Sequence, residues 1–343
     1  MSELMVELTR GGYVESVHTG DVAVVSAKQG LVASYGDAGK KTFWRSAAKP
    51  IQALIPIITG AVDEYGITDD ELALICASHF GEEVHTDAVR SILSKADVPE
   101  AALSCGTHYP FARSASNRLI MEGSKPSQVH HNCSGKHAGM LITCAKMGWP
   151  TEGYFRPDHP VQQAALDIIA EVAEVPRESI GVGVDGCSVS VFYLPLSAMA
   201  RCYAKLADPA FMPPRYREAA ARVTAAMMAH PHMVGGEGSF TTRAMEAYSG
   251  RLFAKNGAEG VFCLGIPEAG LGIALKIADG NDRAYQTAVI GMLDELGMAP
   301  DAGSDLPAVK EINNAKGDVV GWMRPAYRPG SLKGVSAWAC TKG

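Results

Sequence analysis

The sequence predicts an α+β fold in which an antiparallel sheet carries helices. Three observations predict it: a hairpin near the N-terminus, a long helical middle, and short strands followed by a helix near the C-terminus. A parallel βαβ series would instead alternate strands and helices throughout. The chain has 343 residues, of which 47% are hydrophobic, so it can bury a large core. We expect one interwoven domain over residues 1–343, its sheet built from the N-terminal and C-terminal segments.

The N-terminal hairpin is predicted from two alternating segments. DVAVVSA (21–27) and LVASYGD (31–37) flank Gln29-Gly30, and apolar residues that alternate on both sides of a turn indicate paired strands.

The middle of the chain shows helix signals. Ser46 is a suitable N-cap, and Pro50 is tolerated only near a helix start. Thr68 and Glu71 form a capping-box pattern before the apolar run that ends at Ala77-Ser78-His79. Helical periodicity covers two further segments, 158–175 and 213–230.

After residue 250 the pattern changes to strands. RLFAKNG, GVFCLGI and GIALKIADG predict a meander of short strands, and residues 283–297 predict a helix after it. There is no internal repeat or clear linker, which favours one domain over two separable ones.

Composition limits the partners and the compartment. The net charge is −6 and no basic face is visible, so nucleic acid is not expected as a partner. The N-terminus MSELMVELTR lacks the basic and apolar regions of a signal peptide, and no apolar run approaches the ~20 residues of a membrane span. We therefore expect a cytoplasmic protein without a membrane partner. Its eight cysteines are expected to be reduced, mostly buried, with one or two as ligands or reactive groups.

Two motifs match nucleotide-binding patterns only in part. GVGVDG (181–186) fits G-x-G-x-x-G, but an extended segment follows it where a helix is required. In HHNCSGKH (130–137), SGKH resembles the end of a P-loop, yet His137 stands where Ser or Thr should hold magnesium. By itself this stretch is compatible with a metal site or with a nucleophile.

Ser46-Ala-Ala-Lys49 is an S-x-x-K tetrad at a predicted helix start. Residues i and i+3 share one face of a helix, so a lysine there can take the proton of the serine. The alternative interpretation is a capping serine with a surface lysine, because such a tetrad is expected about once by chance in a chain of this length.

Two later features favour a catalytic role for this tetrad. Penicillin-recognising serine acylases use S-x-x-K, then a second serine in S-D-N, then K-T-G on a strand. Here Ser78 and then Lys255, with glycine two residues on, follow in the same order. S-D-N is absent and Asn256 replaces the usual threonine, which argues against β-lactam chemistry but leaves amide hydrolysis open.

Taken together, several segments resemble the bacterial type II L-asparaginase family of the Rhizobium etli inducible type. The likeness runs from the N-terminal hairpin to about residue 300. It is carried by the following segments: RSAAKP, CASH, NCSGKHAGML, PDHP, DGC, AHPHMVGGEG and GIALKIADGN.

The resemblance implies a fold and a reaction. The fold is that of serine β-lactamases and penicillin-binding proteins, with helices on both sides of the sheet and a helical subregion. The implied protein is a homodimer that hydrolyses L-asparagine to L-aspartate and ammonia.

The resemblance also implies the residues of the site. It places catalytic Ser-Lys pairs at Ser46 with Lys49 and at Ser78 with Lys255. It places a Zn²⁺ site, organising substrate binding and not performing the chemistry, at Cys133, Lys136 and Cys187. Residues near the substrate or the metal fall at Arg45, His137 and Asp185.

Three alternatives stay open. The same fold can act on glutamine or another amide, zinc can activate a water in a metallohydrolase, or the chain can be a non-catalytic zinc-binding or thiol-sensing protein.

Overall fold

A computed structural model describes residues 1–327 and divides them into two units. The first unit contains Met1–Thr42, Pro195–Asp208 and the described chain from Ala247 onward, and the second contains Phe43–Leu194 and Pro209–Glu246. The expectation of one interwoven domain stays a prediction.

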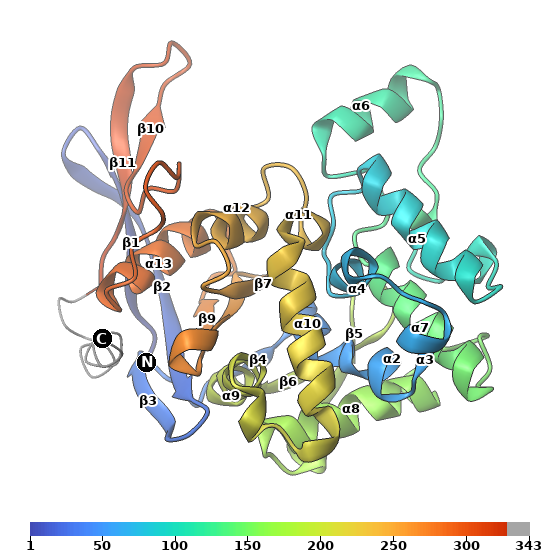
Figure 1. The fold of residues 1–343 in the computed structure, drawn as a ribbon. Helices are drawn as coiled ribbons and strands as arrows, with labels where there is room; N and C mark the ends of the chain where they lie inside the picture. Colours follow the sequence, from blue (N-terminus) through green and yellow to red (C-terminus); the bar gives the residue numbers. More distant parts are fainter. Residues whose placement is uncertain (328–343) are drawn as a thin grey trace. The chain divides into compact units, whose positions relative to one another are not determined.

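The first unit is built on an eight-stranded sheet with strand order β10-β11-β1-β2-β9-β8-β7, in which β3 also pairs with β2 (Figure 1). The pairings are antiparallel. Segments from both ends of the sequence therefore meet in one sheet. Its strands are β1 (Glu3–Arg10), β2 (Tyr13–Ser26), β3 (Gly30–Tyr35), β7 (Phe253–Gly257), β8 (Val261–Ile266), β9 (Leu271–Ile277), β10 (Lys310–Asn313) and β11 (Val319–Pro325).

Two helices cover opposite faces of this sheet. Helix α9 (Leu196–Ala207) packs so closely on Gly272 that a Cβ there would lie 2.0 Å from the backbone nitrogen of Ala204. Helix α13 (Asp282–Glu295) packs through Tyr285 on Phe262, whose register partner is Leu275. Because successive side chains of a strand point to opposite faces, Gly272 and Leu275 face different sides, and the sheet has a helix on each.

The second unit is mainly helical. Its helices are α1 (Lys49–Gln52), α2 (Leu54–Ile58), α3 (Ala61–Glu64), α4 (Asp69–Ile75), α5 (Glu83–Lys95), α6 (Arg113–Met121), α7 (Ser134–Met147), α8 (Pro160–Ala173), α10 (Arg217–Ala229), α11 (Pro231–Val234) and α12 (Phe240–Ala247). A short turn, η1 (Arg45–Ala48), precedes α1, and a small sheet has strand order β4-β6-β5, with bounds β4 (Lys41–Phe43), β5 (Gly181–Val184) and β6 (Ser190–Pro195).

Helix α7 lies at the centre of the second unit, against α4 and α5 (Figure 1). Its first eleven residues are buried, so this part of the helix is enclosed on all sides. Gly135 and Gly139 face α4: a Cβ at Gly135 would lie 2.3 Å from the carbonyl oxygen of Leu74, and one at Gly139 would lie 2.7 Å from Ile75 Cγ2. The glycines of SGKHAGM therefore allow two helices to approach closely.

Most predicted elements are confirmed. The hairpin forms between β2 and β3, the helix predicted over 283–297 is α13, and the meander is β7-β8-β9. Thr68 and Glu71 form the capping box, with the Thr68 backbone N–H donating to Glu71 Oε2 over 2.9 Å. After GVGVDG the chain enters β6, which pairs antiparallel with β5, so the dinucleotide motif lacks its helix.

The prediction that Ser46 caps a helix is wrong. The helical turn begins one residue earlier, at Arg45, with Trp44 at the N-cap position and no side-chain capping bond. Arg45 has φ +53°, a left-handed conformation that a non-glycine residue rarely adopts, and this turns the chain sharply just before Ser46. Pro50 does lie in the first turn of α1, as predicted.

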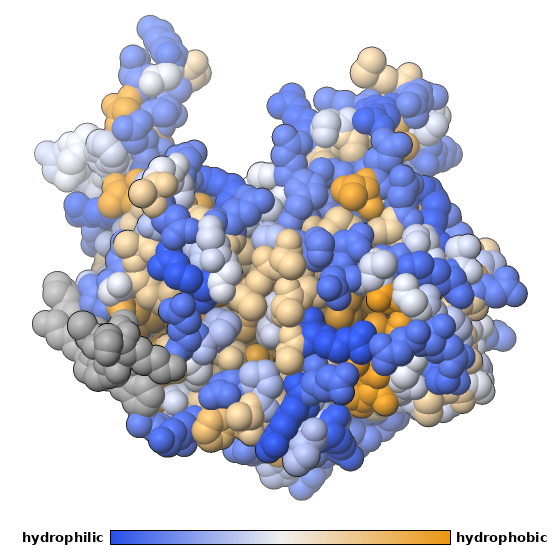
Figure 2. Space-filling model, viewed as in Figure 1, coloured by the Kyte–Doolittle hydropathy of each residue, from blue (hydrophilic) through white to orange (hydrophobic). Residues whose placement is uncertain are grey.

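The predicted fold class is confirmed: a mixed α/β fold with an antiparallel sheet, helices on both of its sides and a helical subregion. The seven cysteines within residues 1–327 are buried thiols, and Cys340 lies outside the described residues. No helix within residues 1–327 is long and apolar enough to cross a membrane. The face shown in Figure 2 carries hydrophilic residues together with areas of apolar residues.

Candidate active site

The S-x-x-K tetrad spans the junction of η1 and α1 in the second unit. Ser46 is half-buried inside η1, while Lys49, the first residue of α1, is 1% exposed. Ala47 and Ala48 between them are buried and small. A lysine almost completely removed from water must have its amine satisfied by specific partners.

The partners of Lys49 come from the segment after α4. Its Nζ donates to the Ser78 hydroxyl over 3.0 Å and to the carbonyl oxygen of Ala77. Within residues 1–327 no hydrogen bond joins this amine to the hydroxyl of Ser46. The structure thus brings together Lys49 and Ser78, which the sequence had assigned to two different pairs.

Ser78 is held in place through its backbone. It lies two residues beyond Cys76, the C-cap of α4, and its N–H donates to the carbonyl oxygen of Val234 over 3.1 Å. The side chain is 7% exposed. Ser78 therefore presents its hydroxyl from a fixed, largely buried backbone.

Lys255 belongs to the first unit. It lies in β7, within the segment RLFAKNG that was predicted as a strand, and its side chain is fully buried. Its Nζ donates to the backbone oxygen and to the side-chain oxygen of Asn256 over 2.8 and 2.7 Å. Its pairing with Ser78 stays a prediction.

Arg45 and Asp185 form an ion pair beside Ser46. The Arg45 Nε donates to Asp185 Oδ1 over 2.9 Å, and 27% of the arginine side chain is exposed. Asp185 is fixed in a tight turn after β5, since its carbonyl oxygen accepts from the N–H of Ser188 and its own N–H donates to Val189. An anchored guanidinium with an exposed edge can bind a carboxylate.

The three residues predicted to bind zinc lie together and are buried. Cys133 precedes α7, Lys136 lies in its first turn, and Cys187 comes from the turn after β5. The Lys136 Nζ donates to Cys187 Sγ over 3.1 Å. A hydrogen bond from the Cys187 thiol lowers the pKa of Cys133 far below its ordinary value, and the same bond raises the pKa of Cys187.

The charge of Lys136 follows from these sulfurs. Burial opposes its charge, but Cys187, Cys133 and Asp185 outweigh burial and raise its pKa. Without a metal, the cluster is thus a thiolate, a thiol and an ammonium ion. Two sulfur donors with an amine suit zinc, which would displace protons from Cys187 and Lys136.

His137 gives a second indication that this region binds a further group. It is fully buried, and its Nε2 has no hydrogen-bond partner among the described residues. Its Nδ1 shares a 2.6 Å hydrogen bond with the Tyr154 hydroxyl. Burial, followed by the Lys136 charge, lowers the pKa of His137 well below its ordinary value. A neutral imidazole with one free nitrogen beside the sulfurs fits a site completed by a metal, water or substrate.

Sequence reasoning missed a cluster of Glu82, His85 and His232, whose potential ligand atoms lie within 4.8 Å of one another. The geometry does not suit one ion. His85 Nδ1 accepts from the Glu82 N–H and its Nε2 bonds to the His232 carbonyl oxygen, so both nitrogens are occupied. The rings of His85 and His232 are also stacked, 8° from parallel, whereas an ion must lie in the plane of each ring it binds. The spacing Glu82-x-x-His85 was the available sequence signal.

A cavity of about 360 Å³ lies between α5 and α6. Glu82, Arg90 and Arg118 contribute to its wall, and none of the predicted site residues does. It is therefore separate from the Lys49–Ser78 pair and the sulfur cluster.

The chain is similar in structure to several solved proteins. A β-lactamase from Mycobacterium bovis is 16% identical, with 80% of this chain and 94% of that chain covered and a TM-score of 0.41. A putative β-lactamase from Bacteroides dorei is 13% identical, with 80% and 93% covered and a TM-score of 0.43. Mglu in its native form is 14% identical, with 84% of this chain but only 66% of Mglu covered and a TM-score of 0.46. Structural similarities this weak give no information about the function of this chain.

The family follows from the sequence match. A search of curated protein sequences finds no match. The family model described as L-asparaginase II matches residues 6–325, which is nearly the whole chain and includes every predicted site residue. The chain therefore belongs to the L-asparaginase II family.

Proposed function

We propose that this chain is an L-asparaginase that hydrolyses the side-chain amide of L-asparagine to L-aspartate and ammonia. Family membership supports an amidohydrolase. The observation that carries the proposal is the buried Lys49 amine, three residues after Ser46 and hydrogen-bonded to Ser78 over 3.0 Å. This is an arrangement in which a lysine serves as a base for a serine.

The hydrogen bonds of Lys49 define the protonation state that the reaction needs. A neutral amine has two N–H groups and one lone pair. The bonds to Ala77 and Ser78 use both N–H groups, which leaves the lone pair for the Ser46 proton. In our proposal the Ser46 oxygen then attacks the amide carbon, ammonia leaves, and water cleaves the β-aspartyl ester.

Ser78 has a supporting role in this proposal. Its hydroxyl keeps the amine of Lys49 in one orientation and relays protons during ester hydrolysis. The resemblance adds Lys255 to the same proton network. Arg45, anchored by Asp185, is proposed to bind the carboxylate of the amino acid, and His137 is proposed to face the substrate or the metal.

Zinc is proposed as a bound ion held by Cys133, Lys136 and Cys187. When bound it would fix the wall that receives the amino acid and supply positive charge there. The sulfur cluster and the unpartnered Nε2 of His137 support this assignment. A homodimer in the cytoplasm remains our expectation from the resemblance and the N-terminal sequence.

Ammonia release tests the proposal. The purified chain is incubated with L-asparagine, L-glutamine and a peptide-like amide, and a zinc chelator is added in parallel. We expect release from L-asparagine, with partial activity after chelation. Preference for L-glutamine would assign a glutaminase, complete loss on chelation would favour a zinc-activated water, and no release from any amide would favour a non-catalytic zinc or thiol protein.

A further inference from the structure

We propose that His79 is a positioning residue that fixes Ser78 and ties it to the first turn of α7. The proposed function gives His79 no role, so this proposal goes beyond it. Only the kinetic test rests on the proposed amide hydrolysis. His79 follows Ser78 directly in the chain and is fully buried.

Both ring nitrogens of His79 are engaged. Nδ1 accepts a hydrogen bond from the N–H of Gly81 over 3.1 Å, and Nε2 lies 2.8 Å from the Ser134 hydroxyl oxygen. The Ser134 hydroxyl donates its own proton to the carbonyl oxygen of Val129. The proton between His79 and Ser134 must therefore lie on Nε2, which gives a neutral ring in one tautomer.

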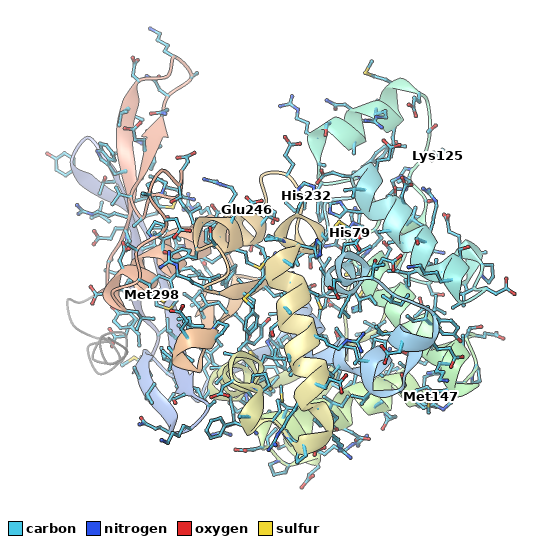
Figure 3. All side chains as sticks on the ribbon, viewed as in Figure 1. His79, Lys125, Met147, His232, Glu246 and Met298 are labelled. Carbon is cyan, nitrogen blue, oxygen red and sulfur yellow. The ribbon has the colours of Figure 1, made fainter. Side chains whose placement is uncertain are left out.

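The environment keeps the ring neutral. Burial lowers the pKa of His79 well below its ordinary value, and the charges of His85 and Lys49 lower it further. The ring of His85 stacks on that of His79 with centroids 5.1 Å apart, and His232 stacks on His85 in turn. Figure 3 labels the two ends of this column, His79 and His232.

The hydrogen bonds join two parts of the candidate site. Ser134 is the first residue of α7, between Cys133 and Lys136 of the sulfur cluster. The His79 backbone N–H also donates to the carbonyl oxygen of Asn132 over 3.2 Å. The segment that presents Ser78 to Lys49 is thus bonded at two points to the start of the helix that carries Lys136.

This link determines where the Ser78 hydroxyl lies. The segment after α4 has no regular secondary structure from Ala77 to Glu82, so its path depends on such bonds. A displacement of about 1 Å in a catalytic group can cost about 10²-fold in rate. Loss of the His79 bonds should therefore lower kcat more than it raises KM.

The kinetic test compares His79→Leu, His79→Gln and Ser134→Ala with His85→Leu as control. His85 is equally buried and also uses both nitrogens; its ring stacks on that of His79, but its hydrogen bonds join Glu82 and His232 and not Ser78 or Ser134. We expect kcat to fall about 10²-fold in His79→Leu with KM within about threefold, and to recover largely in His79→Gln, whose side-chain N–H can replace Nε2–H. Ser134→Ala should lower kcat in the same direction, and His85→Leu should leave it within about threefold. Equal losses in His79→Leu and His85→Leu, or none in His79→Leu, would overturn the role.

A second measurement does not depend on the reaction. Hydrogen exchange is followed by mass spectrometry in peptides covering residues 77–81 and 130–137. His79→Leu and Ser134→Ala should both speed exchange in both peptides, whereas His85→Leu should affect only the region after residue 81. Unchanged exchange at 130–137 in both site variants would overturn the link. If the wild type hydrolyses no amide but the exchange couples as expected, the proposed function fails and the link stands.

Discussion

Two buried lysines in the second unit differ in the atoms they touch. Lys49 donates to oxygen atoms of Ala77 and Ser78, whereas Lys136 donates to the sulfur of Cys187. Hydroxyl and carbonyl partners leave an amine able to exchange protons with a nearby serine, while the sulfurs of Cys187 and Cys133 stabilise the ammonium form of Lys136 until a metal replaces its proton. We therefore assign the base role to Lys49 and the ligand role to Lys136.

Replacement of Lys49 by Met should lower kcat by about 10²-fold or more, the usual loss when a general base is removed. Lys276→Met is the matched control, because Lys276 is also buried and donates to two carbonyl oxygens, those of Glu259 and Ile277. Ammonia release by Lys276→Met should stay near that of the wild type. Equal activity in Lys49→Met and the wild type would remove Lys49 from the mechanism.

Replacement of Cys133 or Cys187 by Ser should lower bound zinc and raise KM more than it lowers kcat. The reason is that zinc is proposed to shape the binding wall and not to act on the amide. Elemental analysis of the purified variants gives the zinc content, and Cys144→Ser serves as control because Cys144 is buried elsewhere in α7. Unchanged zinc in both cysteine variants would refute the ligand assignment.

Individual residues show what could not be predicted from the sequence. The spacing of Ser46 and Lys49 identified the segment of the candidate site. It could not predict that Lys49 bonds to Ser78, because that contact joins α1 to the segment after α4. The N-cap assignment to Ser46 failed because Arg45 adopts φ +53°, and a residue of that type gives no local sign of a left-handed conformation. In the sequence, His79 appeared only within the segment CASH, and no role was predicted for it.

Among the elements, the contact between α4 and α7 decides how the site is assembled. Gly135 and Gly139 are one helical turn apart on the face of α7 that meets Leu74 and Ile75. Close approach of these helices brings the end of α4, and therefore Ser78, near the start of α7. The glycine of the P-loop-like string SGKH therefore has a packing role.

Gly135→Ala should destabilise the fold by about 1–3 kcal/mol, the usual cost of an added group in a packed core. Its Cβ would meet the backbone oxygen of Leu74, which cannot move aside alone. Gly139→Ala should cost less, because its Cβ would meet only the side chain of Ile75. Thermal melting of the two variants tests this order. A Gly135→Ala variant as stable as the wild type would show that the helices are not in such close contact.

Elements with strong local signals were predicted well. Thr68 and Glu71 mark the start of α4, and Gln29-Gly30 marks the turn between β2 and β3. Strands β1, β10 and β11 were missed, and the pairing of β1 with β11 joins segments that are distant in sequence. Thr9, for example, pairs with Val14 on one side and with Trp322 on the other.

Across the whole molecule, stability should depend on buried histidines. Burial is the main cause that lowers the pKa of His79 and of His85. In the unfolded chain they titrate near ~6.5. Above that pH both states are neutral and the two histidines add no pH dependence. Below it the unfolded chain binds protons that the folded chain does not, so stability falls as the pH decreases toward the folded pKa values.

The expected slope is up to ~1.4 kcal/mol per pH unit for each such histidine. Melting temperatures measured between pH 7.5 and 5 should therefore fall with acidification. A His79→Gln, His85→Gln double variant should show a smaller decrease, because glutamine does not titrate. The same decrease in the variant and the wild type would mean that these rings are not buried in neutral form.

The arrangement of the large sheet was predictable only in outline. A hairpin at one end of the chain and a meander at the other indicated a shared antiparallel sheet, which the pairing of β2 with β9 confirms. The order of the remaining strands, including β1 between β11 and β2, could not be read from local patterns because register depends on packing.

The central claim is that Ser46 forms the acyl-enzyme while Ser78 supports Lys49. Rapid acid quenching during turnover of L-asparagine, followed by peptide mass mapping, locates the covalent intermediate. We predict a β-aspartyl ester on Ser46, and neither ester nor ammonia release in a folded Ser46→Ala variant. An ester on Ser78, or undiminished turnover by Ser46→Ala, would contradict the account.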